Sequence, residues 1–298
     1  MRHRYLRWFA VLAVAGCPAA LMAQPNCSIQ DVVGTWAVQG QGTMLPTLPG
    51  ATAPIAVPGA DIGIAYIDFD RTVTLTVTGI TARSGAAAAQ TLSGSFTVNP
   101  DCTAIATAPT PIPGFTFKEQ FVILNQGNEM WTLALNGLSG KPAVWQCHWT
   151  KISPVPWPAS APDWYSNCST GLARGTWVGR YDGVLLPFDP SARMPLGVVL
   201  MGGVTHVGEL EGSLSTSLSG KVSAGTFATK ITQLNLDCTG TWTVTLTGAD
   251  GAPLPGGGVE QFIMLEGGKE IWTISAEGVA GTPVGTGRWR QISSAEYR

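Results

Sequence analysis

The chain has 298 residues, of which 12% are charged and 45% are hydrophobic, and its formal net charge is −2. The charged fraction is about half of the usual ~25%, which excludes a highly charged disordered protein. No basic excess is present to neutralise phosphates, so the composition also excludes nucleic-acid binding through a charged surface.

The N-terminus has the pattern of an export signal. Three arginines precede an apolar run from Trp8 to Gly16, and small residues follow it. We predict a secretory signal peptide over residues 1–23 and a periplasmic or extracellular protein. As an alternative, the segment ending at Cys17 is similar to a bacterial lipobox, in which this cysteine is lipidated and anchors the chain. No later stretch approaches the ~18 apolar residues of a transmembrane helix.

The rest of the chain is a tandem duplication, because motifs recur in the same order at a nearly fixed offset. Most pairs are separated by 141 positions. The matched motifs are Asn26-Cys27-Ser28 with Asn167-Cys168-Ser169, Gly34-Thr35-Trp36 with Gly175-Thr176-Trp177, Glu119-Gln120-Phe121 with Glu260-Gln261-Phe262, and Trp131-Thr132 with Trp272-Thr273. A proline-rich stretch between the copies has the composition of a stiff linker. We therefore predict two domains, 24–153 and 167–298, joined by a linker at 154–166.

Each copy has the pattern of β-strands. The segments 71–78 and 242–247 alternate threonine with valine or leucine, and Trp242 falls on the apolar positions of the second segment, a period of two. Further short β-type runs are separated by Asn-Gly and Gly-Gly turn signals, and no stretch has helical periodicity with caps. The expected fold is all-β, two tandem antiparallel barrels of about eight strands each, with sandwiches as the alternative. The cysteines, proline-rich loops and polar C-terminus disfavour an outer-membrane barrel.

Both copies open with Gly-x-Trp, at Trp36 and Trp177, and close with a basic residue, Lys151 and Arg290. This arrangement resembles the lipocalins and wider calycin barrels, where the first-strand tryptophan closes one barrel end and a last-strand basic residue covers it. The stretch from Phe96 to Thr103 also resembles barrels related to allene oxide cyclase. The calycin resemblance implies a small apolar ligand inside the barrel.

Six cysteines in an exported chain suggest disulfides. Cys168 and Cys238 are the only pair in the second copy and are expected to bond, and by repeat symmetry Cys27 is expected to bond Cys102. Cys147 has no counterpart, since Gly287 takes its place. We expect it to be a buried free cysteine. A reactive Cys147 with His148 as its base is disfavoured, because neighbours on a strand face opposite ways.

The polar residues shared by both copies are the candidate ligand-contacting residues. In each copy two short strands carry a glutamate and an aromatic residue at alternate positions. The candidates for the lumen are Glu119, Phe121, Glu129, Trp131, Glu260, Phe262, Glu270 and Trp272. In a lumen the glutamates could bind a ligand hydroxyl or act as acid and base. Alternatively, each lies in solvent at a strand end or pairs with Lys151 or Arg290.

The sequence contains no catalytic motif that identifies a reaction. The two histidines after residue 23, His148 and His206, lie in different copies, so we expect neither a metal site nor a cofactor. Asp68 and Asp70 are expected to be solvated carboxylates on one strand face. The predicted function is binding of a small hydrophobic molecule in a barrel lumen. The alternatives are a cyclase or isomerase using Glu119 or Glu260, and a cell-surface or matrix interaction protein. The sequence gives no oligomeric state.

Overall fold

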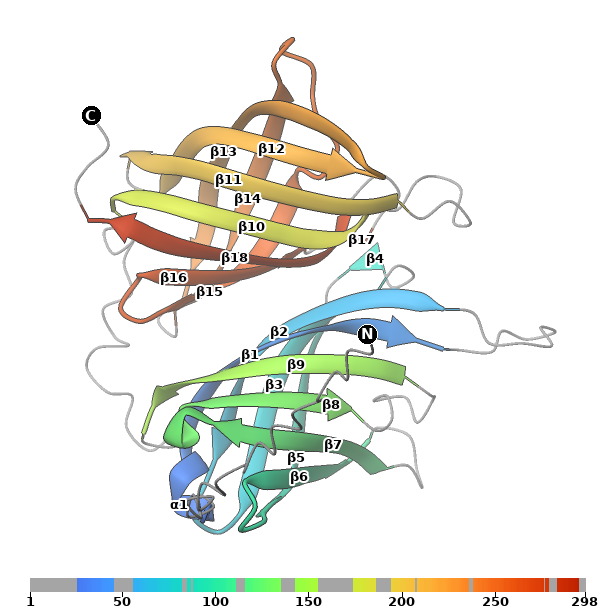
Figure 1. Ribbon diagram of the computed structural model, residues 1–298, viewed down its shortest axis with the longest axis vertical. Helices are drawn as coiled ribbons and strands as arrows, with labels where there is room; N and C mark the ends of the chain where they lie inside the picture. The colour runs from blue at the N-terminus through green and yellow to red at the C-terminus, as the bar shows by residue number, and fades with distance from the viewer. Residues whose placement is uncertain are drawn as a thin grey trace, which may run out of the picture.

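The computed structural model describes residues 26–45, 56–81, 85–86, 88–110, 116–134, 143–154, 174–185, 194–206, 208–235, 238–275, 277–278 and 283–294. Within these ranges the chain forms two closed, antiparallel eight-stranded barrels, as the sequence predicts (Figure 1). The predicted signal peptide with Cys17, nearly all of the predicted linker, and Cys168 lie outside the described residues. No helix of the described residues is long and apolar enough to cross a membrane.

Barrel 1 follows a short helix, α1 (Ile29–Val32). Its strands neighbour one another in chain order and the last closes on the first. They are β1 (Gly34–Met44), β2 (Val57–Ile67), β3 (Thr72–Thr81), β5 (Ala88–Val98), β6 (Thr103–Pro109), β7 (Thr116–Leu124), β8 (Glu129–Ala134) and β9 (Ala143–Ser153). A 3₁₀ turn, η1 (Asn125–Gly127), joins β7 to β8. The strand expected at 71–78 is thus present as β3.

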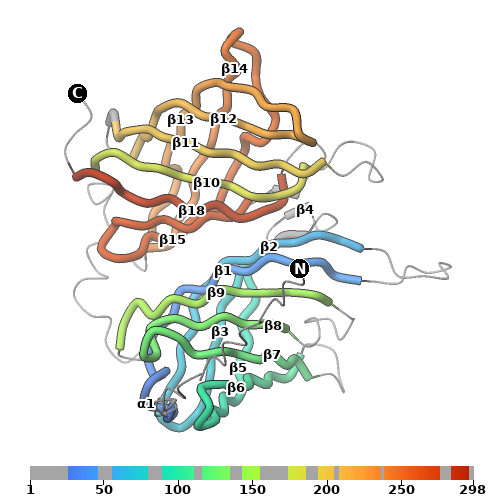
Figure 2. Tube along the Cα trace, in the orientation of Figure 1, coloured from blue at the N-terminus to red at the C-terminus, as the bar shows by residue number. Residues whose placement is uncertain are grey.

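Barrel 2 repeats the same order, so the duplication extends to strand pairing (Figure 2). Its strands are β10 (Thr176–Leu185), β11 (Met194–His206), β12 (Glu209–Leu218), β13 (Lys221–Leu234), β14 (Thr239–Gly248), β15 (Gly258–Leu265), β16 (Glu270–Ser275) and β18 (Pro283–Ser293). Two short strands, β4 (Gly85–Ala86) and β17 (Glu277–Gly278), pair with each other between the barrels.

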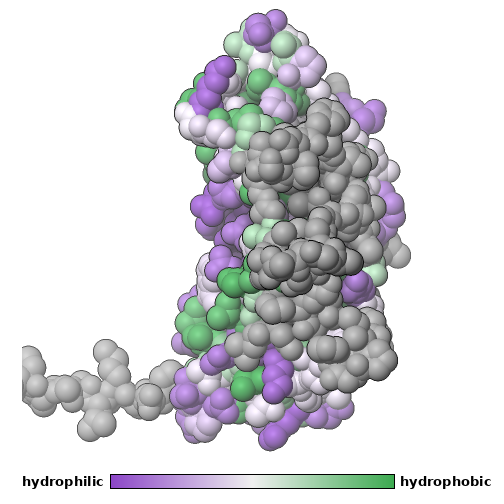
Figure 3. Space-filling view, turned by 90° about the vertical axis from the view of Figure 1, so that its right-hand side faces the viewer, coloured by the Kyte–Doolittle hydropathy of each residue, from purple (hydrophilic) through white to green (hydrophobic). Residues whose placement is uncertain are grey.

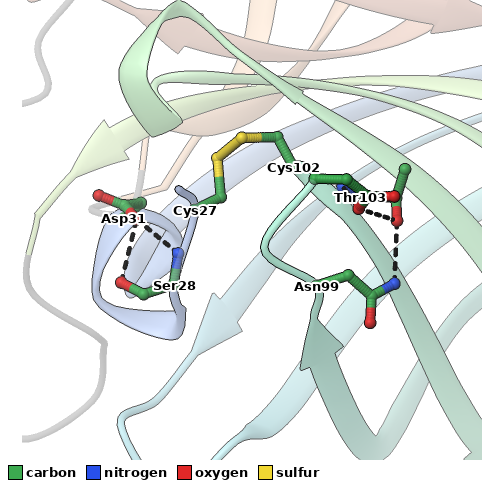
Figure 4. Close-up of a disulfide and its surroundings, with 7 residues drawn as sticks. Cys27, Ser28, Asp31, Asn99, Cys102 and Thr103 are labelled. Carbon is green, nitrogen blue, oxygen red and sulfur yellow. Dashed lines mark hydrogen bonds between the residues drawn. A yellow bond between two sulfur atoms is a disulfide. The ribbon is translucent and has the colours of Figure 1, made fainter. Parts of the chain in front are cut away.

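One end of barrel 1 is closed by α1 and held by a disulfide. Ser28 caps the helix by donating hydrogen bonds from its backbone and hydroxyl to the Asp31 carboxylate. The predicted Cys27–Cys102 disulfide is present and ties this segment to the start of β6 (Figure 4). Cys238 is also disulfide-bonded, while its predicted partner lies outside the described residues.

Each barrel has its own apolar interior, because alternate residues of every strand point inward. The side chains of Trp36, Phe96, Phe121 and Trp149 fill the end of barrel 1 nearest α1, with Phe121 packed edge-on against Phe96 and Trp149. In barrel 2 Trp177, Phe262 and Trp289 hold the positions that match Trp36, Phe121 and Trp149, and Trp242 on β14 packs against Phe262 and Trp289. A small apolar cavity of about 20 Å³, enough for about one water molecule, lies beside Trp177 and Trp242. The described part of the barrel 2 interior is therefore largely filled by side chains.

The barrels also pack against each other through a third apolar cluster on their outer surfaces. Barrel 1 contributes β1 and β2, and barrel 2 contributes β15, β16 and β18, as Figure 1 shows. The residues on the barrel 1 side are Ala37, Ala60, Ile62 and Ile64, and those on the barrel 2 side are Ile263, Leu265, Trp272, Ile274 and Val284. The Gln39 amide donates hydrogen bonds to the backbone oxygens of Thr273 (3.3 Å) and Gly287 (2.9 Å) across the junction.

Candidate functional site

Two carboxyl groups reach the inside of barrel 1, one from β7 and one from β2. Glu119 on β7 is 3% exposed, and the Thr132 hydroxyl on the adjoining β8 donates a hydrogen bond to it. Asp61 on β2 faces the same interior, because its neighbours Ala60 and Ile62 face barrel 2. Both carboxyls lie in the half of the barrel away from α1, beyond the aromatic core.

Gly40 on β1 leaves space for three polar groups to gather. A Cβ atom on this residue would lie 2.2 Å from Asp61 Oδ1, 2.7 Å from Cys147 Sγ and 2.7 Å from Trp145 Nε1. Asp61 Oδ1 and Trp145 Nε1 are both shielded from solvent, and neither has a hydrogen-bond partner among the described residues. A buried polar atom without a partner costs about 1–3 kcal/mol. This pair is therefore a place where a ligand could make hydrogen bonds that the protein does not make itself.

The surroundings favour the neutral forms of these acids. Burial raises the pKa of Glu119 to about 7, against the opposing effect of hydrogen bonds with Thr132 and Cys147. Burial and the nearby Glu119 raise the pKa of Asp61 to about 7, and the neighbouring Trp145 side chain and Gly40 backbone oppose this rise.

Cys147 is a buried free cysteine, as expected from the sequence. Burial and the neighbouring acids raise the pKa of its thiol well above the ordinary value. A thiol that stays protonated is a poor nucleophile. His148, the next residue, faces outward, so the structure separates the two residues as the strand alternation predicts.

Barrel 2 fills the matching position with a tyrosine. Tyr181 is the repeat counterpart of Gly40, and Val198 lies opposite it on β11, where barrel 1 has Asp61. The Tyr181 ring takes up space that Gly287 leaves open, since a Cβ on that glycine would lie 3.2 Å from the ring. The Tyr181 hydroxyl is hydrogen-bonded to Ser275, so its polar atom is satisfied.

Glu260, the counterpart of Glu119, is also buried inside barrel 2. Its carboxylate accepts a hydrogen bond from Trp242 Nε1 at 2.8 Å. Burial raises the pKa of Glu260, and the Trp242 hydrogen bond opposes this effect. Glu260 thus has a protein partner next to the Phe262 ring, which packs against Trp242.

The eight residues expected in the lumens divide between the two faces of the barrel walls. Glu119, Phe121, Glu260 and Phe262 are inside, as expected. Glu129 and Trp131 are on the outer surface of barrel 1, because the inward positions of β8 belong to Met130, Thr132 and Ala134. Glu270 and Trp272 are on the outer surface of barrel 2, where Trp272 packs against barrel 1. A lumen site can include only the first four.

The outward glutamates have polar partners of their own. Glu129 lies 2.9 Å from His148 Nε2 and accepts a hydrogen bond from Trp131 Nε1 at 2.9 Å. Glu270 pairs with Arg288 and accepts a hydrogen bond from Trp272 Nε1. The partners suggested by the sequence, Lys151 and Arg290, are not the ones found.

The calycin-like closure is present in barrel 1. Trp36 is fully buried and its Nε1 donates to the backbone oxygen of Val32 in α1, while the Lys151 ammonium lies 5.1 Å from the Trp36 ring centroid and donates to Asp31 O. In barrel 2 Trp177 is equally buried, but the register sets Gln291 opposite it. Arg290 is one residue away, so its side chain is exposed on the outer face.

The remaining candidates lie in turns or form no cluster. Asp68 and Asp70 are in the turn between β2 and β3 rather than on a strand, and their carboxylates accept hydrogen bonds from the backbone N–H groups of Phe69 and Thr72. The side chain of His206 lies outside the described part. Among the described residues no group of three or more histidine, cysteine or acidic side chains could hold a metal ion.

Asp61 and Trp145 are the site residues that sequence reasoning missed. On β2, isoleucines alternate with aspartate and glycine, so the apolar face looks like the inner face. Here the outer face is apolar because barrel 2 covers it. The only available signal is that Gly40 and Tyr181 differ between the copies at matched positions.

Comparison with known proteins gives a low-level likeness in fold. No family model matches the chain, and no curated protein matches it. A solved structure from Nitrosomonas europaea, provisionally assigned as AttH, is 10% identical with a TM-score of 0.30, covering 93% of this chain and 97% of that one. A tryptophan-to-alanine mutant of the vaccine antigen transferrin-binding protein B from Haemophilus parasuis Hp5 is 9% identical with a TM-score of 0.28, covering 86% and 75%. A likeness at this level carries no argument about ligand or activity.

Proposed function

We propose that the protein binds a small, largely apolar molecule carrying one basic group inside barrel 1. The observation that carries the proposal is the pair of buried polar atoms without partners, Asp61 Oδ1 and Trp145 Nε1, gathered beside Gly40. Buried polar atoms in native structures are nearly always hydrogen-bonded. A ligand ammonium at this place would donate a hydrogen bond to Asp61 Oδ1, and an acceptor elsewhere on the ligand would take the Trp145 Nε1 proton.

The charge of the site favours a basic ligand over an acidic one. Asp61 and Glu119 are two neighbouring acids, and no basic side chain is among the causes of their pKa shifts. An ammonium group placed there would stabilise the ionised carboxylates, whereas a carboxylate would add a third acid to the same site. The aromatic core beneath, including Phe121, provides an apolar contact for the rest of the molecule.

Barrel 2 supports this assignment by contrast. There Tyr181 occupies the position corresponding to the space beside Gly40, and its hydroxyl has a partner. At this position barrel 2 holds a tyrosine ring, whereas barrel 1 holds the carboxyl of Asp61 and the indole N–H of Trp145. We infer one ligand per chain, held by barrel 1.

Calorimetric titration with matched small probes tests the proposal. Phenethylamine, phenethyl alcohol and phenylacetate share an aromatic body and differ in the head group. We expect the amine to bind with one site per chain, at least tenfold more tightly than the alcohol, with no binding of the acid. Equal binding of all three, preference for the acid, or no binding of the amine would contradict the proposal.

Two substitutions locate the site. Gly40→Ala would place a Cβ against Asp61, Cys147 and Trp145, and should abolish amine binding. Gly197→Ala on β11 is the matched control, since a Cβ there has nothing within 4 Å, and it should bind like the parent protein. Retained binding in the Gly40→Ala protein would rule out this location.

A catalytic role for the same carboxyls is the second candidate. A carboxyl with its pKa raised to about 7 can give or accept a proton near neutral pH, which general acid–base chemistry requires. Turnover of a bound amine that Glu119→Gln abolishes while binding persists would favour an enzyme. Unchanged ligand after prolonged incubation would favour a binding protein.

We further propose that the chain is exported. The Cys27–Cys102 disulfide supports this, because such bonds persist in oxidising compartments. Mass spectrometry of the mature N-terminus distinguishes cleavage after Ala23 from lipidation of Cys17, and an unprocessed N-terminus would contradict export by either route.

A further inference from the structure

The junction between the barrels joins two unlike surfaces, and the duplication gives each barrel a copy of both. We call the barrel 2 side face A, formed by Ile263, Leu265, Trp272, Ile274 and Val284, and the barrel 1 side face B, formed by Ala37, Ala60, Ile62 and Ile64. Inside one chain, face A of barrel 2 contacts face B of barrel 1. Face A of barrel 1 and face B of barrel 2 lie outside this junction cluster, although face A of barrel 1 borders it, because Trp131 stacks on His148 and the His148 ring stacks on Trp272.

The unused copy of face A is apolar and exposed. The repeat offset and strand registers match its residues one for one with those of barrel 2. They are Val122 for Ile263, Leu124 for Leu265, Trp131 for Trp272, Leu133 for Ile274 and Val144 for Val284. All five are between 39% and 62% exposed, whereas their counterparts are buried. Figure 3 shows hydrophobic surface at the left edge of the lower barrel, the side turned to the viewer in Figure 1.

The unused copy of face B has the same character. The pairing of β10 with β11 matches Val178 to Ala37, Val199 to Ile62 and Met201 to Ile64. Val199 is 59% exposed and Met201 is 52% exposed. In the described part of the chain, eleven large hydrophobic residues are exposed. Eight of them correspond in the repeat to residues that form the junction cluster or pack against it. Exposed apolar residues scattered at random would not fall on these positions.

The polar contacts of the junction also have complementary counterparts. Gln39 donates to the backbone oxygens of Thr273 and Gly287. Its counterpart Arg180 is a donor whose side chain is 74% exposed and forms a surface ion pair with Asp182 at 3.2 Å. The Gln41 amide and the Thr286 hydroxyl lie 3.4 Å apart across the junction. Their counterparts are Asp182 and Gln146, an acceptor and a donor. The unused faces could therefore form the same kind of contact.

We propose that face A of barrel 1 in one molecule binds face B of barrel 2 in a second copy of this chain. The contact repeats between chains the junction already present within the chain. It is heterologous, since it joins two different surfaces, and such contacts either close into rings or continue as filaments. Face A centres on β8 and face B on β1 and β2, so roughly a quarter to a third of the barrel circumference separates them. At this spacing a second chain has room on face A beside the barrel that already covers face B. Repeating the contact then closes a ring of two or three chains.

Light scattering coupled to size-exclusion chromatography of the purified protein, over a range of concentrations, tests the assembly. We expect dimers or trimers that dissociate on dilution. Trp131→Glu disables face A of barrel 1, and Met201→Glu disables face B of barrel 2, and each variant alone should be monomeric at concentrations where the parent assembles. Both side chains are half-exposed in the monomer, so circular dichroism should show intact barrels.

Mixing the two variants distinguishes the proposed contact from nonspecific hydrophobic association. Each retains the face that the other has lost, so the mixture should form a heterodimer through one contact, while neither forms homodimers. Val222→Glu is the control, because Val222 is 70% exposed but lies outside both faces, and it should assemble like the parent. A monomeric parent, self-assembly of either single-face variant, or a mixture that stays monomeric would overturn the proposal. So would binding of the parent to lipid vesicles that both variants lose, since this would assign the faces to a membrane surface.

Discussion

Two tryptophans at matched positions of the duplication allow a quantitative test of the junction between the barrels. Trp131 and Trp272 each donate a hydrogen bond from Nε1 to a glutamate two residues earlier on the same strand. They differ in surroundings, since Trp272 is 0% exposed against barrel 1 and Trp131 is 48% exposed. Replacing each with alanine therefore removes the same local contact, but only Trp272→Ala also removes packing between barrels.

The expected difference follows from the area buried. A tryptophan side chain buries up to about 250 Å², so a 48% difference in exposure corresponds to roughly 120 Å², or about 3 kcal/mol at 25 cal/mol per Å². We expect Trp272→Ala to lower the free energy of unfolding by about 3–5 kcal/mol, and Trp131→Ala by about 1–2 kcal/mol. Guanidinium denaturation followed by circular dichroism, at concentrations where the parent is monomeric, measures both. Equal losses would refute the assignment of Trp272 to a junction that stabilises the chain.

Three further predictions concern the interior of barrel 1 and its closed end. Removing the Cys27–Cys102 disulfide as a double serine variant should lower the free energy of unfolding by about 4–5 kcal/mol, because the bond closes a loop with a sequence separation of 75; a loss below 1 kcal/mol in denaturation experiments would contradict this. Because Glu119 has its pKa raised from 4.5 to about 7 on folding, the folded state binds more protons between these pH values, and stability should fall as pH rises from about 4.5 through 7. Glu119→Gln should weaken this dependence, by up to about 3 kcal/mol between the ends of the range, and an unchanged pH profile would place the titration elsewhere. Cys147 should resist alkylation at pH 8 in the folded protein and react once guanidinium unfolds it, since burial raises the pKa of its thiol; rapid labelling of the native thiol, located by peptide mass, would show that the interior is open.

The fold could be predicted from the sequence because its signals are local and doubled. Period-two segments such as 71–78 fix strands, and the repeat offset of 141 fixes two equal barrels. The Cys27–Cys102 disulfide was predicted by repeat symmetry, because Cys168 and Cys238 are the only pair of cysteines in the second copy. The helix α1 was not predicted, since four residues are too short to show a helical period.

The sequence did not distinguish the inner from the outer face of the barrel strands as well as it predicted the strands themselves. In an isolated soluble barrel the apolar positions of a strand face inward, which is why Trp131 and Trp272 were expected to be in the lumen. In this chain the outer surfaces of β8 and β16 are apolar as well, so alternation alone does not identify the inner face. For the same reason Asp61 was not identified as an inward-facing residue, because Ile62 and Ile64 on the other face of β2 are apolar and form the junction.

The two copies differ at several interior positions, while the apolar character of face A is kept in both. Inside, Gly40 is replaced by Tyr181, Asp61 by Val198 and Cys147 by Gly287. Outside, all five residues of face A remain large and apolar in both copies, although in barrel 1 they lie in solvent. Solvent-exposed strand positions accept polar residues at little cost, and an apolar surface carries a risk of aggregation. An exposed face that stays apolar while interior residues change is expected where that face binds a partner. The surface that fits it is already present on barrel 2.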